Sequence, residues 1–441
     1  MEIPFMWDIV FLTLALPLLE VIILRQNYRI MSPVTIFCAA FFLLYSMPYL
    51  VHFYITPDSH LSRLSNSEVI MALNVIRCFI YPLFFILVSL MFRVAKLQPN
   101  ELNVDFAAIK HRAIFVFLFF CLTSTLTLGT GVGFSPSAMI DRAINPRAYT
   151  YIKAGLGPLT HLHSGVQFSL LVLASVMIFL SGKSIRSMLF FGLCTFGAFL
   201  GGGKSSIVLP FIILIVIWQK MTSWQKNIFS KLYRTMMIGI LGMVLVILGF
   251  AFLGTPGERV GFKDAAARIP GYHREAYYLS RVLEYFPWSS EYPVKLLQDT
   301  LIAPIPRAIW KSKPGYGIWI RYFRPAFEPN TELYHTSTFG CLTEAHMFFG
   351  RFGPYIYGIV WAFFLYKLYV YILLSKNLFK VFLVSTSSFW IYLLLRTGFS
   401  GTNTSIMVIY LFIGWFLLRK TGHYHVDEPI YEETLQQEPA Q

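Results

Sequence analysis

Long runs of apolar residues alternate along the chain with short polar connections. About eleven runs of about 16 to 25 residues are present, and helices of that length can cross the roughly 30 Å hydrocarbon core of a bilayer. Strands are not favoured, because regular alternation is absent and open sheet edges would leave backbone groups unpaired in lipid. The pattern predicts an all-α integral membrane protein with spans at 6–24, 34–55, 69–92, 113–132, 164–182, 186–201, 204–219, 235–254, 351–375, 378–396 and 404–418.

Two connections are longer than the joining of spans requires, at 133–163 and 255–350. Long ordered loops in a membrane protein of tight turns commonly carry its chemistry. The pattern divides the chain into four parts. They are an N-terminal bundle of about eight spans, a large loop containing short helices, a group of C-terminal helices and a disordered cytoplasmic tail, at 1–254, 255–350, 351–420 and 421–441.

The composition supports a membrane protein and the charges orient it. Hydrophobic residues make up 56% and charged residues 13%, which is too little polar surface to cover a soluble globule of 441 residues. Cations in the short connections gather on one side, which the positive-inside rule makes cytoplasmic, with both long loops outside. The net charge of +14 therefore reflects topology, and no nucleic-acid partner is expected.

The strongest chemical signal is the outward segment 303–324, which holds five cations, five aromatic residues and no carboxylate. The planar guanidinium group of arginine can bind two phosphate oxygens at once, and the ammonium group of lysine adds a point charge. An aromatic ring such as that of Trp310 can stack on a sugar. The alternatives are attraction to anionic headgroups for any single cation and an interfacial belt for any single aromatic residue. The cations are Arg307, Lys311, Lys313, Arg321 and Arg324.

Three further cations are candidates for binding an anion. Lys204 lies in the turn GGGKSS (201–206), whose amide groups at a helix start can cradle a phosphate, although a plain tight turn is the alternative. Arg77 and Arg396 fall within predicted spans, where an ionisable group is a functional candidate. Glu20 lies near the end of its span and is expected to reach the boundary. The chain has no Asp-x-Asp and no paired cysteine spacing, so we expect neither metal nor cofactor.

Two stretches resemble a known family. PRAIWKSKPG (306–315) and TSTFGCLTEAHMFFGRFG (336–353), followed by a span, are similar to the motifs of oligosaccharide repeat-unit polymerases, the O-antigen polymerase (Wzy-type) family of bacterial inner membranes. Outside these stretches the chain resembles the family only in architecture, with many spans and a dominant late outward loop.

The resemblance implies a metal-independent membrane glycosyltransferase of GT-C-like type. Such an enzyme moves a glycan from undecaprenyl pyrophosphate onto another lipid-linked repeat unit at the periplasmic face, and a chain-length regulator is a possible partner. Arg307 and Lys313 match the motif as cations for the leaving diphosphate, and Glu344 matches it as the proton acceptor. Arg351 is a further candidate for binding the diphosphate or the glycan, and the alternative is that it only pairs with Glu344.

Two other functions remain open at this stage. An O-antigen ligase would share the spans, the late loop and the arginines but would pass the glycan to a lipid A core. A transporter or flippase for lipid-linked oligosaccharides should show two similar halves with interrupted spans near the bilayer midplane, and no internal repeat is visible in the sequence.

Overall fold

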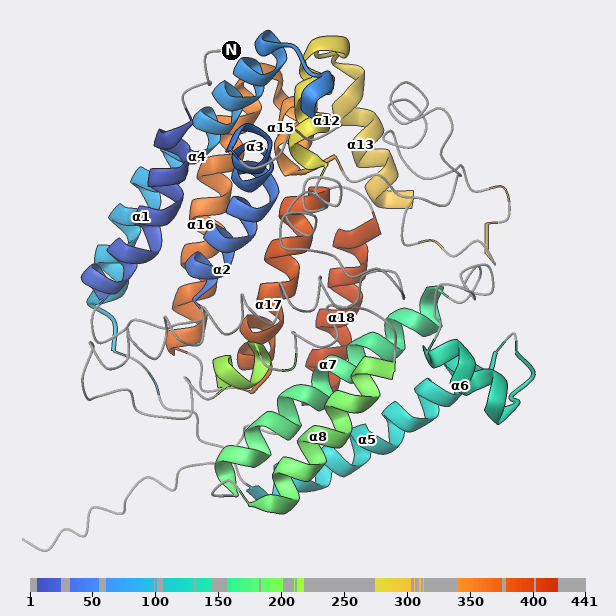
Figure 1. The fold of residues 1–441 in the computed structure, drawn as a ribbon. Coiled ribbons are helices and arrows are strands. Elements are labelled where there is room, and N and C mark those ends of the chain that lie inside the picture. Colours follow the sequence, from blue (N-terminus) through green and yellow to red (C-terminus); the bar gives the residue numbers. More distant parts are fainter. Residues whose placement is uncertain are drawn as a thin grey trace, which may run out of the picture.

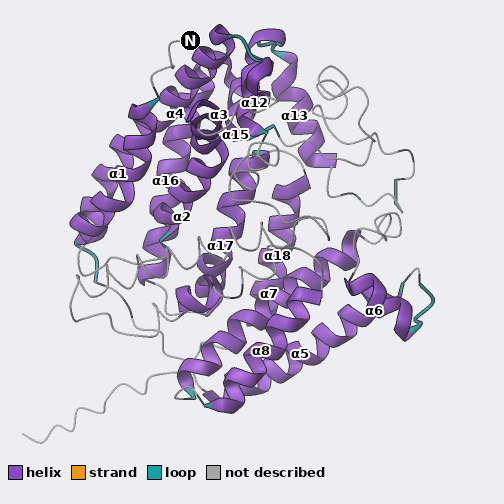
Figure 2. Cartoon of the chain, in the orientation of Figure 1, coloured by secondary structure: helices purple, strands orange, loops and turns teal. Residues whose placement is uncertain are grey.

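A computed structural model gives the fold, and it describes residues 6–24, 32–54, 61–98, 100, 106–130, 132–144, 157–181, 184–200, 210, 212–217, 274–302, 305, 309–310, 312, 339–374, 378–399 and 402–418. The regular structure of these residues is entirely helical (Figures 1 and 2). Seven of the described helical segments are long and apolar enough to cross a membrane, and two shorter apolar helices accompany them. The prediction of an α-helical membrane protein is confirmed at this level.

The long helices coincide with predicted spans. They are α1 (Trp7–Leu24), α2 (Pro33–Phe41), which continues through a π turn (Phe42–Ser46) into α3 (Met47–Tyr54), α4 (Asn66–Ala95), α5 (Phe106–Gly129), α7 (Gly157–Leu180), α8 (Ile185–Leu200), α16 (Gly353–Leu374), α17 (Leu378–Thr397) and α18 (Thr402–Leu418). Of the predicted span 204–219, residues 210 and 212–217 are described, and 235–254 lies outside the described residues. Four shorter helices lie in the long connections: α6 (Pro136–Ile144), α12 (Glu275–Tyr285), α13 (Glu291–Ile302) and α15 (Cys341–Phe349).

Some helices begin before their apolar runs because their first turns are polar. α4 begins at Asn66, where Ser65 and Glu68 form a capping box: the Ser65 hydroxyl accepts the Glu68 N–H (3.3 Å) and the Glu68 carboxylate accepts the Ser65 N–H (2.6 Å). α5 begins at Phe106 and so carries Lys110 and Arg112 within the helix. Hydropathy therefore locates the apolar part of these helices, but it does not locate the residues at which they begin.

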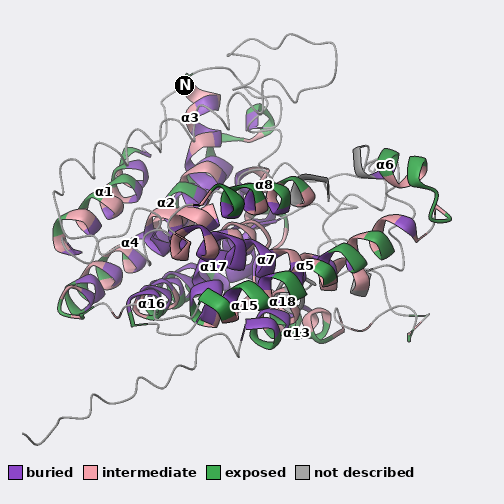
Figure 3. Ribbon diagram, turned by 90° about the horizontal axis from the view of Figure 1, so that it is seen from below, coloured by how far each residue is buried: buried purple, intermediate pink, exposed green. Residues whose placement is uncertain are grey.

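The helices form two packed groups that share α17. In one group α4 packs against α1, α12 and α16, and α2 packs against α17. In the other, α7 packs against α5, α8 and α18. Buried positions gather around α7 and α17 (Figure 3). One side of α17 joins the first core through Ile391 and Leu394, and the other joins the second through Phe382 and Trp390.

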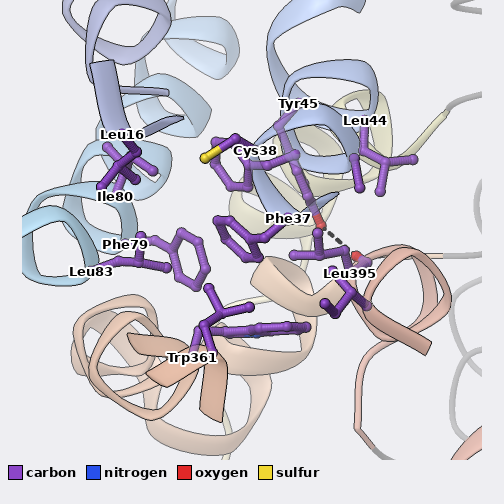
Figure 4. Close-up of a cluster of buried hydrophobic side chains, with 14 of the residues drawn as sticks. Leu16, Phe37, Cys38, Leu44, Tyr45, Phe79, Ile80, Leu83, Trp361 and Leu395 are labelled. Carbon is purple, nitrogen blue, oxygen red and sulfur yellow. Dashed lines mark hydrogen bonds between the residues drawn. The ribbon is translucent and has the colours of Figure 1, made fainter. Parts of the chain in front are cut away.

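Aromatic rings fill the first core (Figure 4). The Phe37 ring lies 5.2 Å from that of Trp361, and the Phe41 ring lies 5.5 Å from that of Phe79, measured between centroids. Lipid tails are as apolar as these rings, so close packing rather than escape from water holds such helices together. Large rings packed at this distance therefore set the spacing of α2, α4 and α16.

The crossing of α4 and α16 depends on Gly358. A Cβ atom at this position would overlap the Phe79 carbonyl oxygen and approach Pro82 Cγ to 3.0 Å. We expect Gly358→Ala to destabilise the folded protein by about 1–3 kcal/mol, because two helix backbones would have to separate. Denaturant unfolding in detergent measures this effect. Gly192→Ala on α8 is the matched control, because a Cβ there meets nothing within 4 Å, and it should be neutral or slightly stabilising.

The two ends of the bundle differ in charge. At one end α12 and α15 lie beside the first turns of α4 and α16 (Figure 1), and we call this the α12–α15 end. At the other end Asn100 binds the end of α16, with its N–H donating to Leu373 O (2.9 Å) and its side chain to Leu374 O (3.0 Å). Arg63 lies near α12 at the first end. Most described cations in or beside the short connections fall instead at the second, cationic end: Arg93, Lys96, Lys110, Arg112, Arg186 and Lys380.

Candidate functional site

Glu344 lies on α15, which folds back against the start of α16. α15 ends at Gly350, whose φ of +59° favours glycine, and a short 3₁₀ turn (Gly350–Phe352) leads into α16. A Cβ atom at Gly353 would overlap the Ala345 carbonyl oxygen, so only glycine allows the two helices to lie this close. The sequence predicts Glu344 just before a span, and the structure places it on a separate helix with its side chain fully buried.

Two donors hold the Glu344 carboxylate. Its Oε1 accepts the Tyr357 hydroxyl at 2.8 Å and the backbone N–H of Phe399 at 2.7 Å. Tyr357 comes from α16 and Phe399 follows α17, so three elements converge on one oxygen. Hydrogen bonds to a carboxylate are stronger than neutral ones, and a pair from separate helices fixes its orientation.

The end of α17 makes the Phe399 N–H available. Gly398, with φ of +86°, stands just past the helix, and its N–H donates to Leu394 O at 2.8 Å. This closes the helix with the single bond of an αL cap, and the next N–H donates to Glu344. A Cβ atom at Gly398 would overlap Glu344 Oε2. Glycine is therefore required here both for the cap and for the approach of Glu344.

A second buried carboxylate meets the same turn of α17. Glu275, the first residue of α12, is fully buried, and its Oε1 lies 3.1 Å from Arg396 Nε. The Arg396 side chain is 34% exposed, and it also hydrogen-bonds Tyr392 one turn earlier. A carboxylate at a helix N-terminus is stabilised by the helix dipole. The last turn of α17 is thus held between Glu275 and Glu344.

Tyr45, in the π turn between α2 and α3, contacts both the end of α17 and the start of α15. Its hydroxyl lies 3.1 Å from Leu395 O (Figure 4) and 3.5 Å from the backbone N of Leu342. Gly340 has a φ of +83°, and a Cβ atom at this position would overlap the Tyr45 hydroxyl and approach Glu275 Cβ to 3.3 Å. We call Tyr45, Glu275, Glu344, Tyr357 and Arg396 the α17-end cluster.

The cluster contains two of the residues that the sequence selected, Glu344 and Arg396. The sequence did not select the other three members, Tyr45, Glu275 and Tyr357, or Gly398, which caps α17 beside them. Gly398 carried a local signal, since a glycine directly after an apolar run is a common helix cap. The others join the cluster through contacts between distant segments, which no spacing in the sequence reveals.

Other candidates lie elsewhere. Arg77 binds Asp8 of α1, with its Nε 2.7 Å from Oδ2, so it holds α1 against α4. Arg351 is exposed and its guanidinium lies 5.1 Å from the Phe352 ring, whereas the Glu344 carboxylate is buried and binds Tyr357 and the Phe399 N–H. Trp310 donates its indole N–H to Ser312 Oγ at 3.0 Å. The remaining cations lie outside the described residues, and their site stays a prediction: Lys204, Arg307, Lys311, Lys313, Arg321 and Arg324.

The expectation for Glu20 was wrong. Its side chain does not reach the boundary but is fully buried, where Oε2 accepts the hydroxyls of Ser32 (2.8 Å) and Thr35 (3.1 Å). Ser32 caps the start of α2. Glu20 therefore links α1 to the first turn of α2.

Arg281 anchors α12 beside the cluster. Its guanidinium donates to Glu68 Oε1 and to the Arg63 carbonyl, both at 3.0 Å, and lies over the Tyr277 and Tyr285 rings. Burial opposes the charge of Arg281, but Tyr277, Tyr285 and the Glu68 carboxylate favour it, and its pKa is raised above the usual value. Arg281 thus positions α12, and with it Glu275.

The cluster places an oriented carboxylate, Glu344, and a guanidinium, Arg396, at the same end of α17, at the α12–α15 end. Such a pair can accept a proton from a hydroxyl and stabilise negative charge on a departing group. Within the described residues no group of three His, Cys, Asp or Glu side chains could hold a metal ion. Comparison with models of protein families, with curated proteins and with solved structures found no match to this chain.

Proposed function

We propose that this protein polymerises lipid-linked oligosaccharide repeat units, carried on undecaprenyl pyrophosphate, by glycosyl transfer at the α12–α15 end. One observation carries the proposal: the buried carboxylate of Glu344 binds the residue that follows the end of α17, and the guanidinium of Arg396 projects from the last turn of the same helix. The motif resemblance to repeat-unit polymerases selects the same carboxylate independently of its geometry.

In the proposed reaction the acceptor sugar hydroxyl attacks the anomeric carbon of the donor glycan. The bond from that carbon to the lipid diphosphate breaks, and its electron pair leaves with the diphosphate. Glu344 takes the hydroxyl proton, with Tyr357 and the Phe399 N–H holding the carboxylate in place. Arg396 stabilises the charge that develops on the diphosphate, together with Arg307, Lys313, Arg321 and Arg324 of the motif segment.

The proposed location is the bacterial inner membrane, with the α12–α15 end in the periplasm. Most described cations in or beside the short connections lie at the opposite end, and cytoplasmic connections of membrane proteins are enriched in Lys and Arg. Lipid-linked glycan is then both donor and acceptor in the periplasmic leaflet.

Incubation of the purified protein in nanodiscs with an undecaprenyl-pyrophosphate-linked repeat unit tests this function. We expect a ladder of products that differ by one repeat, formed without nucleotide and in the presence of a chelator. A single product that appears only when lipid A core is added would show a ligase. Movement of the substrate across a vesicle membrane without any product would show a transporter, and either result would overturn the proposal.

A further inference from the structure

α13 presents an exposed apolar stripe. Val294, Leu297 and Leu301 recur at helical spacing, and their side chains are 55%, 55% and 74% exposed. On another side of the helix, Leu296 is buried in a small core formed with Tyr278, Val282, Phe339 and Met347. α13 is thus fixed to the fold along one side while its stripe faces outward.

On the exposed side of α13, polar residues lie next to the apolar stripe. Glu291 and Gln298 are exposed on the flank beside the stripe, and Lys295 Nζ lies 2.6 Å from Glu291 Oε2. A helix with adjoining apolar and charged flanks suits the boundary between acyl chains and headgroups, where each flank meets its own solvent.

The position of α13 relates the stripe to the membrane spans. Before the helix, Trp288 donates its indole N–H to Met347 O at 3.1 Å, and its ring lies against Gly350 at the turn into α16. α13 contacts α15 and α18 (Figure 1) and lies at the edge of the molecule (Figure 3). The helix therefore extends between the ends of two spans.

We propose that the α13 stripe is embedded in the acyl chains of the leaflet at the α12–α15 end. An exposed apolar surface begins at the same turn with Phe352 and continues along α16 with Ile356 and Val360. An exposed apolar patch of this kind marks a contact surface, and here the neighbouring apolar phase is the bilayer. The inference does not depend on the proposed chemistry, because it concerns only the surroundings of α13.

Site-specific labelling in vesicles tests this contact. Cys121 and Cys78 are accessible and are replaced by serine, whereas Cys38, Cys194 and Cys341 are buried. A polarity-sensitive fluorophore is then attached to Leu297→Cys or Leu301→Cys in phosphatidylcholine vesicles containing lipids with nitroxide on their acyl chains. We expect blue-shifted emission and strong loss of intensity at both positions, compared with little change at the neighbouring Gln298→Cys.

Two results would overturn the proposal. Quenching of positions 297 and 301 by aqueous iodide, to the same extent as position 298, would show that the stripe faces water. Blue-shifted emission that nitroxide lipids leave undiminished would show that protein, either a partner or a second copy, covers it. Thermal unfolding of each labelled variant, and labelling of the background without an introduced cysteine, exclude misfolding and residual signal as causes.

Discussion

Glu344→Gln is expected to lower glycan polymer formation by about 10² to 10⁴-fold, which is the usual contribution of a positioned proton acceptor. The amide oxygen of glutamine can still accept the hydroxyl of Tyr357 and the N–H of Phe399, so the helices should remain packed. What the variant loses is the ability to take the acceptor proton. The measurement is the initial rate of ladder formation in nanodiscs at equal protein concentration.

Two further variants separate catalysis from structure. Tyr357→Phe removes one donor to the carboxylate, a loss of about 1 kcal/mol, so we expect a several-fold slower rate with polymer still formed. Glu284→Gln is the matched control, because Glu284 is an exposed carboxylate on α12 and should tolerate the change. A Glu344→Gln protein that is abundant in the membrane and makes wild-type ladders would remove Glu344 from the mechanism.

Hydropathy predicted most of the described spans because the thickness of a bilayer imposes one length on them. It did not reveal where a short helix reverses direction. The 255–350 connection was expected to contain short helices, but not that one of them, α15, folds against α16 and buries Glu344. The reversal depends on the φ of Gly350 and on the missing side chain of Gly353. These are properties of backbone packing, and they leave no trace in apolar periodicity.

Part of the candidate site was also predictable, because charged residues near membrane spans are conspicuous in a sequence whereas their packing partners are not. Glu344 and Arg396 stood out because charged groups near or within spans are rare and costly. Their partners did not stand out, since tyrosine is common throughout this aromatic chain and Glu275 is one of many polar residues in the 255–350 connection. What distinguishes Tyr357 and Glu275 from similar residues nearby is the packing of α15 and α16 against α17 and the ion pair that joins α12 to Arg396.

Arg396→Ala is expected to destabilise the protein by about 3 kcal/mol, because removing one partner of a buried ion pair leaves the other uncompensated. Glu275 is fully buried at the start of α12 and has no surface exposed to solvent. The value lies at the lower end of the usual range, since the Arg396 side chain is itself a third exposed. Denaturant unfolding in detergent micelles measures the change.

The double variant Glu275→Gln, Arg396→Ala identifies the cause. If an uncompensated Glu275 carboxylate is responsible, neutralising it should restore about 1–3 kcal/mol, the coupling expected of residues in contact. Equal instability of the double variant and Arg396→Ala would contradict this explanation. Activity gives an independent result: the restored double variant should still polymerise poorly, because the guanidinium proposed to face the diphosphate is absent. Glu275→Gln alone keeps that guanidinium and should retain most of the rate.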